Sequence, residues 1–231
     1  TTVVHKINLT TTAPIKAKIY PVPVHLQKVF DDEVDKLLEL GIIQRSRSDF
    51  CSPVVLVRKP DCSFRLTVDY RVLNSITKFD SEPSFNIEDD LHKFTGSEYF
   101  SEIDITKAYH QVELDENSRP LTAFPTNKGL MEYTKMPFGA VTACATYARL
   151  MRIVLENLPD VTYYFDNILI YSKTWNDHVI TLSKVFQRLK LHIYLLLHHL
   201  SFAIFEFTLI YRNAIMKLDE DNHLEIHLFY L

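Results

Sequence analysis

Two aspartates stand in strand-like, otherwise apolar stretches of this 231-residue chain, and they constrain its fold more than any other feature. Asp104 lies within YFSEIDIT, and Asp166 comes about sixty residues later, between VTYYF and NILIYS. Aspartate is depleted in β-strands unless something specific holds it. The β-branched and aromatic residues on both sides of Asp166 predict a hairpin with a short turn. The sequence therefore predicts one carboxylate at a strand end and another at a turn tip.

Carboxylates in these two positions can share a divalent cation. Magnesium prefers oxygen ligands, and phosphoryl transfer uses two metal ions roughly 3.5–4 Å apart to activate the attacking oxygen and stabilise the leaving one. The pattern thus indicates chemistry of the polymerase type. Asn167 stands where a further carboxylate would be expected, so a site of this kind can be recognised and still be impaired.

Composition limits the remaining possibilities. The length and the 47% hydrophobic content agree with a globular protein of one large domain or two lobes. A net charge of −4 gives no overall basic surface, so contact with nucleic acid requires a local patch.

An odd number of cysteines without CxxC or His/Cys spacing argues against a disulfide framework and a zinc site. The three are Cys51, Cys62 and Cys144. We expect a reducing, intracellular setting, and an opening without a signal pattern indicates a fragment of a longer product that is not secreted.

The first half of the chain predicts an extended segment, a helix and a hairpin. Prolines block regular structure before residue 25, and a helix is expected over His25–Leu40 with Gly41 as its stop. SPVVLVRKP and SFRLTVDY then predict two strands of a β-hairpin. Four basic residues near this hairpin could supply a local positive patch, and a solvated edge strand protected by charge explains them equally well. They are Arg58, Lys59, Arg65 and Arg71.

The second half predicts a βαββα-like core, which is an α+β pattern. Its first strand, over residues 99–106, places Glu102 and Asp104 on one face because strand side chains alternate. The remaining expected elements are a hairpin over 122–133 with Gly129 at its turn, a helix over 142–158, the hairpin over 161–172 and a helix over 176–190.

An apolar stretch over residues 191–211 follows, about twenty residues long and so long enough in principle to cross a bilayer. Histidines and Glu206 within it make a membrane span costly, so a buried or poorly folded tail is favoured and no membrane contact is expected. The pair His198 and His199 lacks an acidic or cysteine partner at helical spacing and is interpreted as incidental.

Several motifs, in a fixed order, carry a resemblance to a known family. They are ELGIIQRSRSDFCSPVVLVRKPDCSFRLTVDYRVLN, YFSEIDITKAYHQVEL, TAFPTNKGLMEYTKMPFGAVTACATYARLM and YFDNILIYS. Across residues 5 to about 190 the chain resembles the reverse transcriptase region of a Gypsy-like long-terminal-repeat retrotransposon Pol polyprotein. Ordered motifs of this kind are far more specific than a lone turn with one aspartate.

The resemblance implies an α+β, right-hand polymerase fold with palm and fingers, and with a thumb that is absent or unrecognisable. The implied divisions are fingers over 1–78 and 112–142, palm over 79–111 and 143–198, and a divergent tail over 199–231.

The resemblance also implies a role for each residue of the metal site. Asp104 would bind two magnesium ions, Asp166 would be the second ligand, and Asn167 would occupy the third ligand position. A polar position on an edge strand is the alternative for Asp104. A turn-forming role is the alternative for Asp166, because aspartate favours tight turns.

For the incoming nucleotide, the resemblance implies that the forked guanidinium of Arg65 contacts the triphosphate and that Lys59 assists as a point charge. Tyr109 would lie under the sugar and exclude ribonucleotides, although a core aromatic is the alternative. Phe138 and Gly139 would border the nucleotide and template, with glycine allowing close backbone approach.

Three departures from the family pattern affect the expected activity. Asn167 offers one neutral oxygen in place of two charged ones, a loss corresponding to roughly 10²–10³ in rate, and manganese is expected to restore part of it. Cys62 replaces a glycine of the fingers turn, and Cys144 replaces a proline or serine. No glycine follows Gly139, so the Gly-containing hairpin that grips the primer is not recognisable.

The leading interpretation is a reverse transcriptase domain that binds an RNA or DNA template-primer and deoxynucleoside triphosphates. RNase H and integrase regions of a longer polyprotein would be further partners, in the cytoplasm or in retrotransposon particles. A degenerate domain that at most binds nucleic acid is the main alternative, and a protein anchored in a membrane by residues 191–211 is a third.

Overall fold

The chain forms two compact units in a computed structural model, which describes residues 3–11, 13, 17–59, 64–82, 91–105, 107–192, 205–211, 214–218 and 224–228. Val3–Ser81 and Tyr109–Thr146 make up one unit, here called the N-terminal unit. Glu82–Ala108 and Tyr147–Leu231 form most of the other, here called the sheet unit. The turn at Cys62 and the pair His198 and His199 lie outside the described residues.

Helix α1 of the N-terminal unit, Gln27–Glu39, confirms the helix expected from the sequence, and a 3-10 turn, η1 (Val24–Leu26), precedes it. It buries Phe30, Val34 and Leu37, which recur at helical spacing. Gly41 ends the helix in the left-handed region at φ 64°. Its N–H donates to the Leu38 carbonyl, and the N–H of Ile42 donates to the Leu37 carbonyl, the bonding pattern of a glycine C-cap.

The same unit contains three small sheets. The expected hairpin of β3 (Val54–Arg58) and β4 (Phe64–Val68) is confirmed. A three-stranded sheet has the order β2-β8-β7, formed by Ile43–Arg45, Gly129–Tyr133 and Phe124–Thr126. Val4–His5 (β1) pairs in parallel with Glu113–Leu114 (β6). The short helices are α2 (Arg71–Ser75), η3 (Ala108–Gln111) and η4 (Arg119–Thr122).

The predicted hairpin over 122–133 is confirmed as β7 and β8, but its start and its turn residue differ from the prediction. Thr122 ends η4, because its hydroxyl bonds back to the Arg119 carbonyl and closes a turn. Residues 127 and 128 form the turn, and Gly129 is already the first residue of β8. Thr126 stabilises that turn through its own hydroxyl, which contacts the backbone N–H of Lys128 and the Gly129 carbonyl.

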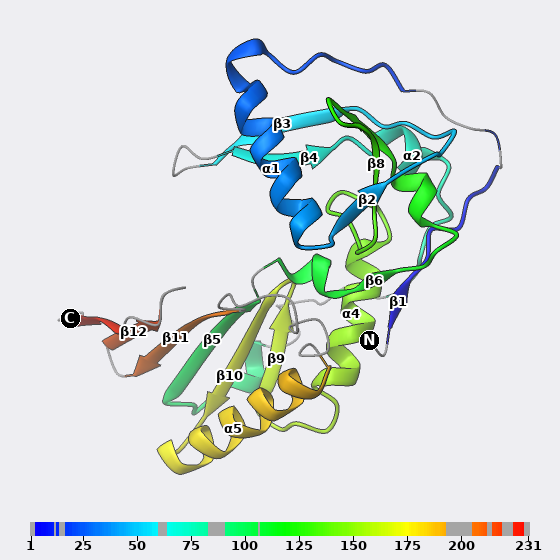
Figure 1. The fold of residues 1–231 in the computed structure, drawn as a ribbon. Helices are drawn as coiled ribbons and strands as arrows, with labels where there is room; N and C mark the ends of the chain where they lie inside the picture. Colours follow the sequence, from blue (N-terminus) through cyan, green and yellow to red (C-terminus); the bar gives the residue numbers. More distant parts are fainter. Residues whose placement is uncertain are drawn as a thin grey trace. The chain divides into compact units, whose positions relative to one another are not determined.

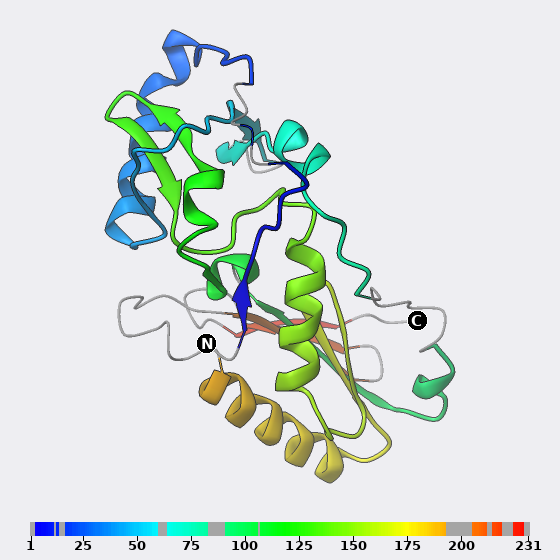
Figure 2. The ribbon, with the colours of Figure 1, turned by 90° about the vertical axis from the view of Figure 1, so that its right-hand side faces the viewer.

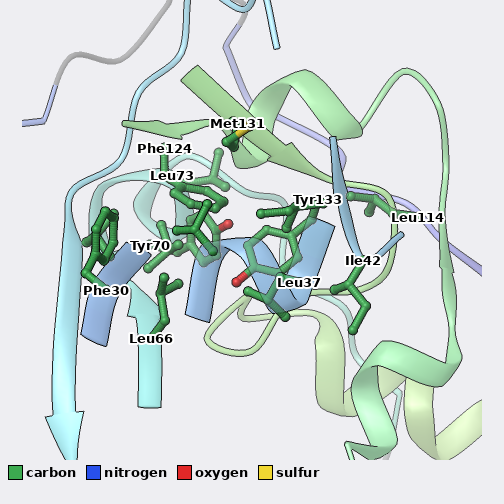
Figure 3. Close-up of a cluster of buried hydrophobic side chains, with 14 of the residues drawn as sticks. Phe30, Leu37, Ile42, Leu66, Tyr70, Leu73, Leu114, Phe124, Met131 and Tyr133 are labelled. Atoms are coloured by element: carbon green, nitrogen blue, oxygen red, sulfur yellow. The ribbon is translucent and has the colours of Figure 1, made fainter. Parts of the chain in front are cut away.

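A single buried cluster holds the N-terminal unit together (Figure 3). It joins α1 to the hairpin and to the three-stranded sheet through Phe30, Leu66, Phe124 and Tyr133, all at most 8% exposed. Tyr70 lies in the same cluster and donates its hydroxyl to the Thr122 carbonyl at 2.9 Å, so its one polar atom is satisfied. Burial raises the pKa of Tyr70, which stays neutral.

The sheet unit contains a six-stranded sheet of order β13-β12-β11-β5-β10-β9 (Figure 1). The predicted strand is β5 (Tyr99–Ile105), and the predicted hairpin is β9 (Val161–Tyr164) with β10 (Asn167–Ser172). Helix α5, Trp175–His192, lies against one face of this sheet, as Figures 1 and 2 show. A 3-10 turn, η2 (Leu91–Phe94), precedes β5.

Helix α4 spans Ala143–Val154 and is shorter than the predicted helix over 142–158. Residues 155–157 and 159–160 form turns, with Asn157 and Asp160 at positive φ. Two residues oppose a helix that continues to residue 158: Asn157 at φ 59° lies outside helical geometry, and Pro159 disfavours that geometry at the residue before it. Apolar residues recur at helical spacing beyond Val154, so the sequence pattern predicted a helix that is too long.

The C-terminal strands extend the sheet beyond the strand that carries Asp104, and one of them, β11, pairs with that strand. They are β11 (Phe205–Tyr211), β12 (Ala214–Leu218) and β13 (Leu224–Leu228). Because β11 pairs with β5 along its whole length and β10 pairs with the other side, β5 is an interior strand. The edge-strand alternative for Asp104 is therefore wrong. Within the described part of the chain, no helix is long and apolar enough to span a membrane, and residues 205–211 are a strand.

His178 joins α5 to β5 and β10, the strands that carry Asp104 and Asn167. Its ring is fully buried, with Nε2 2.7 Å from Oγ of Ser101 in β5 and Nδ1 3.1 Å from Oγ of Ser172 in β10. Burial lowers the pKa of His178, so the ring stays neutral and both nitrogens take part in hydrogen bonds.

His5 of the N-terminal unit gives a prediction about acid stability. The side chain is fully buried with Nδ1 2.7 Å from Oγ1 of Thr146, and burial lowers its pKa to about 4 although Asp80 partly opposes this shift. Below pH 6.5 the unfolded chain gains a proton that the folded chain does not. We expect the stability of the native chain to decrease, relative to His5→Gln, by about 3 kcal/mol between pH 7 and pH 4.

Urea unfolding of both proteins across this pH range measures the difference. The exposed His25 provides the matched control, because His25→Gln should run parallel to the native chain. Parallel curves for His5→Gln and the native chain would show that the buried ring does not govern acid stability.

Candidate active site

Antiparallel pairing of β5 with β10 brings the acidic residues of the two motifs together. Asn167 lies directly opposite Asp104 in this register, and the backbone N–H of Ile105 donates to the Asp166 carbonyl at 3.1 Å. Directly opposite residues of antiparallel strands have Cα atoms only about 4.5–5.5 Å apart. The side chains of Asp104 and Asn167 are half-buried, whereas Asp166 is exposed.

Asp166 occupies the two-residue turn between β9 and β10, as the sequence predicted. The preceding residue, Phe165, has φ 51°, a conformation that bulky side chains rarely adopt. Its ring packs edge-on against Tyr164 with ring centroids 4.6 Å apart, and both rings are about half exposed. Backbone strain of this kind is often concentrated at functional sites.

Glu102 is a residue of this site that the sequence analysis placed on the face of Asp104 without assigning it a role. Its Oε1 accepts a hydrogen bond of 2.6 Å from Nδ2 of Asn167. The two residues are 65 positions apart, so no local pattern signals the contact. The face therefore carries a hydrogen-bonded acid–amide pair beside Asp104.

The candidate metal-ligand atoms of this site are oxygens, which fits a hard cation such as magnesium. Asp104, Asp166 and the amide oxygen of Asn167 are the candidates from the sequence. Among the residues that the structure describes, no three His, Cys, Asp or Glu side chains are grouped so as to hold a metal ion.

A second group of predicted residues lies together in the N-terminal unit. The guanidinium carbon of Arg65 is 6.0 Å from the ring centroid of Phe138, and the rings of Phe138 and Tyr109 have centroids 4.9 Å apart. His110 packs edge-on against Phe138 at 5.1 Å. The structure thus brings a cation and three aromatic rings into one cluster.

Tyr109 is half-buried and lies outside the core, so the core-aromatic alternative is wrong. Its hydroxyl lies 3.2 Å from Sγ of Cys144 in the first turn of α4, a contact that the sequence did not predict. Cys144 is exposed and Cys51 half-buried, and both are free thiols. The replacement at Cys144 therefore positions a polarisable group against the predicted sugar-contacting ring.

Gly139 borders this cluster with φ 88°, which favours glycine. Asn74 of α2 holds the loop from both sides: its Nδ2 donates to the Gly139 carbonyl at 2.8 Å, and its Oδ1 accepts from the N–H of Val141 at 3.0 Å. In the sequence, Asn74 is the last residue of the first motif and carries no local signal of this role. Its role depends on a contact with residues more than sixty positions away.

The four basic residues of the predicted patch are all exposed, but one of them is paired with an acidic residue. Arg58, Lys59 and Arg65 are exposed on the hairpin, but Arg71 begins α2. The guanidinium of Arg71 forms several hydrogen bonds with Asp69, the shortest 2.6 Å, and these hold the pKa of Asp69 below its ordinary value. Arg71 is therefore paired with an acidic neighbour, although its side chain is exposed like those of the other three basic residues.

This fold and these residues define the palm and fingers of a right-hand, template-directed polymerase. A family model described as "Reverse transcriptase (RNA-dependent DNA polymerase)" matches residues 57–196. The chain belongs to this family, and it is a reverse transcriptase domain of the kind found in Gypsy-like long-terminal-repeat retrotransposon Pol polyproteins.

Two curated relatives illustrate that class. The retrovirus-related Pol polyprotein from transposon 297 of Drosophila melanogaster is 37% identical over 195 residues, covering 81% of this chain and 18% of that protein. The transposon Tf2-7 polyprotein of Schizosaccharomyces pombe is 34% identical over 173 residues, covering 74% and 13%. The chain thus spans less than a fifth of the length of these relatives.

Solved structures of the foamy viral protease-reverse transcriptase share the fold. The complex with an RNA/DNA hybrid has a TM-score of 0.75 and 25% identity, covering 82% of this chain and 26% of that one. The complex with double-stranded DNA has a TM-score of 0.69 and 25% identity, covering 82% and 38%. These titles describe what the foamy viral protein binds.

Proposed function

We propose that this chain adds deoxynucleotides to a primer 3′-hydroxyl under the direction of an RNA or DNA template, with release of pyrophosphate. The register of Asp104 opposite the Asp166–Asn167 hairpin carries the proposal, because it places the predicted ligands of the reverse transcriptase family together. The nucleic acids in the foamy viral complexes support a template-primer duplex as the partner. RNase H and integrase regions of a longer Pol product are further proposed partners.

We assign the sheet unit to the palm and the N-terminal unit to the fingers. The sheet unit contains the strand of Asp104 and the hairpin of Asp166, and the N-terminal unit contains the basic hairpin and the cluster around Phe138. In this assignment the palm and fingers divide at Glu82, Ala108 and Thr146.

Reverse transcriptases use divalent metal ions, and we propose that Asp104 and Asp166 hold two magnesium ions, for which manganese can substitute. Bound ions would stabilise the attacking and leaving oxygens of phosphoryl transfer. The protein contributes the position of the ligands. The antiparallel register fixes Asp104, and the bond from the Ile105 N–H to the Asp166 carbonyl fixes the turn.

For the nucleotide, we propose that Arg65 binds the triphosphate and that Lys59 adds a second positive charge. The Arg65 guanidinium lies over the ring of Phe138. This contact leaves the forked N–H donors of the guanidinium for hydrogen bonds to the phosphate groups. Tyr109 packs on the same ring and would restrict the space for a 2′-hydroxyl. Asn74 keeps Gly139 and its loop in place beside the cluster.

Asn167 is proposed to slow the reaction without abolishing it, and Asn167→Asp tests this. A charged carboxylate in place of a neutral oxygen attracts a metal ion more strongly, so the rate of primer extension should rise by about tenfold or more. The full 10²–10³ is not expected, because the new carboxylate would stand against Glu102. The native chain should extend faster in manganese than in magnesium.

The measurement is extension of a labelled primer on an RNA template, in magnesium and in manganese. Asn157→Asp in the exposed turn after α4 is the matched control and should leave the rate unchanged. An Asn167→Asp rate equal to the native rate would refute our account of the third ligand. No extension by any of these proteins would refute the polymerase proposal.

The second candidate function is binding of nucleic acid without catalysis, favoured by the exposure of Arg58, Lys59 and Arg65 on one hairpin. Affinity would then depend on phosphate contacts and decrease steeply with salt. Duplex binding that persists when no variant extends a primer would select this function.

A further inference from the structure

The side chains of Glu102 and Asn167 form one pair on the sheet face that carries Asp104. Oε1 of Glu102 lies 2.6 Å from Nδ2 of Asn167, and both side chains are half-buried. In the register of β5 and β10, Asn167 is opposite Asp104 and Leu169 is opposite Glu102. The pair therefore lies on the diagonal of the ladder, within reach of long side chains.

The chemistry of the pair decides how the amide is oriented. A carboxylate accepts hydrogen bonds and donates none, so the NH₂ end of Asn167 faces Glu102 and Oδ1 is the other end. The terminal torsion of asparagine is soft, and without such a partner the two ends exchange readily. Only the oxygen end attracts a cation, because the NH₂ end presents positive partial charge to it.

The pair also retains a negative charge next to position 167. The reverse arrangement, with an amide at position 102 and a carboxylate at position 167, would have the same net charge and the same kind of hydrogen bond. Coulomb attraction decreases only in inverse proportion to distance, so a carboxylate one hydrogen bond away still contributes to holding a cation. The loss at Asn167 is thereby partly compensated by its neighbour.

We propose that Glu102 is a positioning residue of the polymerase site: it fixes the Asn167 amide with Oδ1 available to a divalent cation and supplies charge that position 167 lacks. The part that concerns metal binding rests on the function proposed above. The hydrogen-bonded pair itself does not, and it can be tested without any polymerase assay.

The exchange variant Glu102→Gln with Asn167→Asp tests the pair, together with both single variants. In the absence of divalent ions, Asn167→Asp places two carboxylates against each other and should lower the midpoint of thermal unfolding by about 4 °C or more. Glu102→Gln should lower it less, because two amides can still bond. The exchange variant should return to within about 2 °C of the native midpoint.

Manganese binding to the full chain without nucleic acid tests the positioning role, read from the paramagnetic resonance signal of free Mn²⁺. Glu102→Gln should weaken binding by about tenfold, the usual effect of losing a group that orients a ligand, and the exchange variant should recover the native affinity or exceed it. Glu156→Gln removes the same charge from an exposed position after α4 and should change the affinity less than about twofold.

Two results would overturn the proposal: unfolding midpoints of the single variants that simply add in the exchange variant, or native manganese affinity in Glu102→Gln. If the exchange variant recovers both properties but no variant extends a primer, the pair stands and the polymerase proposal fails. The two hypotheses are thus separated by different readouts.

Discussion

Replacing Asp104 by asparagine is expected to lower the rate of primer extension by about 10³-fold or more while leaving the protein folded. The substitution keeps the shape of the side chain but exchanges two charged oxygens for one neutral oxygen. Because position 167 is already an asparagine opposite Asp104, Asp166 would be left as the last carboxylate of the predicted ligand set. The neutral amide of Asn167 and the single carboxylate of Asp166 do not replace the charge that is lost.

Primer extension under single-turnover conditions, in magnesium and in manganese, measures this effect. Asp160→Asn provides the matched control, because Asp160 lies exposed in the turn before β9 at φ 58°, a conformation that asparagine also tolerates. The thermal midpoint of Asp104→Asn should stay close to that of the native chain, since the side chain is only half-buried. A rate within tenfold of native would remove Asp104 from the proposed catalytic set.

The strand of Asp104 and the hairpin of Asp166 could be predicted because their signals are local. Alternating side chains, β-branched residues and a turn residue specify a hairpin within about twelve positions, and the structure has β9 and β10 where the pattern indicated. Helix α1 was equally readable, since Gly41 in the left-handed region ends it where the sequence placed its stop. Ends without such a residue, as in α4, were predicted less well.

Contacts between distant residues could not be predicted from such patterns. Glu102 was placed on the correct face, but its hydrogen bond to Asn167 depends on the register of two strands 65 residues apart. Asn74 contacts the loop at Gly139, and Cys144 contacts the hydroxyl of Tyr109; both contacts join residues that are distant in the sequence. Arg71 was predicted to belong to a basic patch because of its charge, whereas in the structure its guanidinium is hydrogen-bonded to Asp69.

Arg65→Ala is expected to lower kcat/KM for the incoming deoxynucleotide by about 10²-fold, with most of the effect in KM. The charge-assisted hydrogen bonds of one guanidinium to a phosphate contribute about 1.5–3 kcal/mol, which corresponds to that range. Arg65→Lys should recover only part, because an ammonium lacks the planar fork and stacks less well on Phe138, 6.0 Å from the guanidinium carbon. The graded order Arg, Lys, Ala is therefore the specific expectation.

Steady-state kinetics at varied nucleotide concentration with a fixed template-primer distinguish this role from general binding of nucleic acid. If Arg65 contacts the triphosphate, the affinity for the duplex should change little while KM for the nucleotide rises. If Arg65 instead contacts the phosphate backbone, duplex affinity should decrease and its salt dependence should become shallower. Lys36→Ala, on the exposed face of α1, removes a cation from the same unit and should alter neither quantity. The result therefore decides whether the cation beside Phe138 serves the nucleotide or the template-primer.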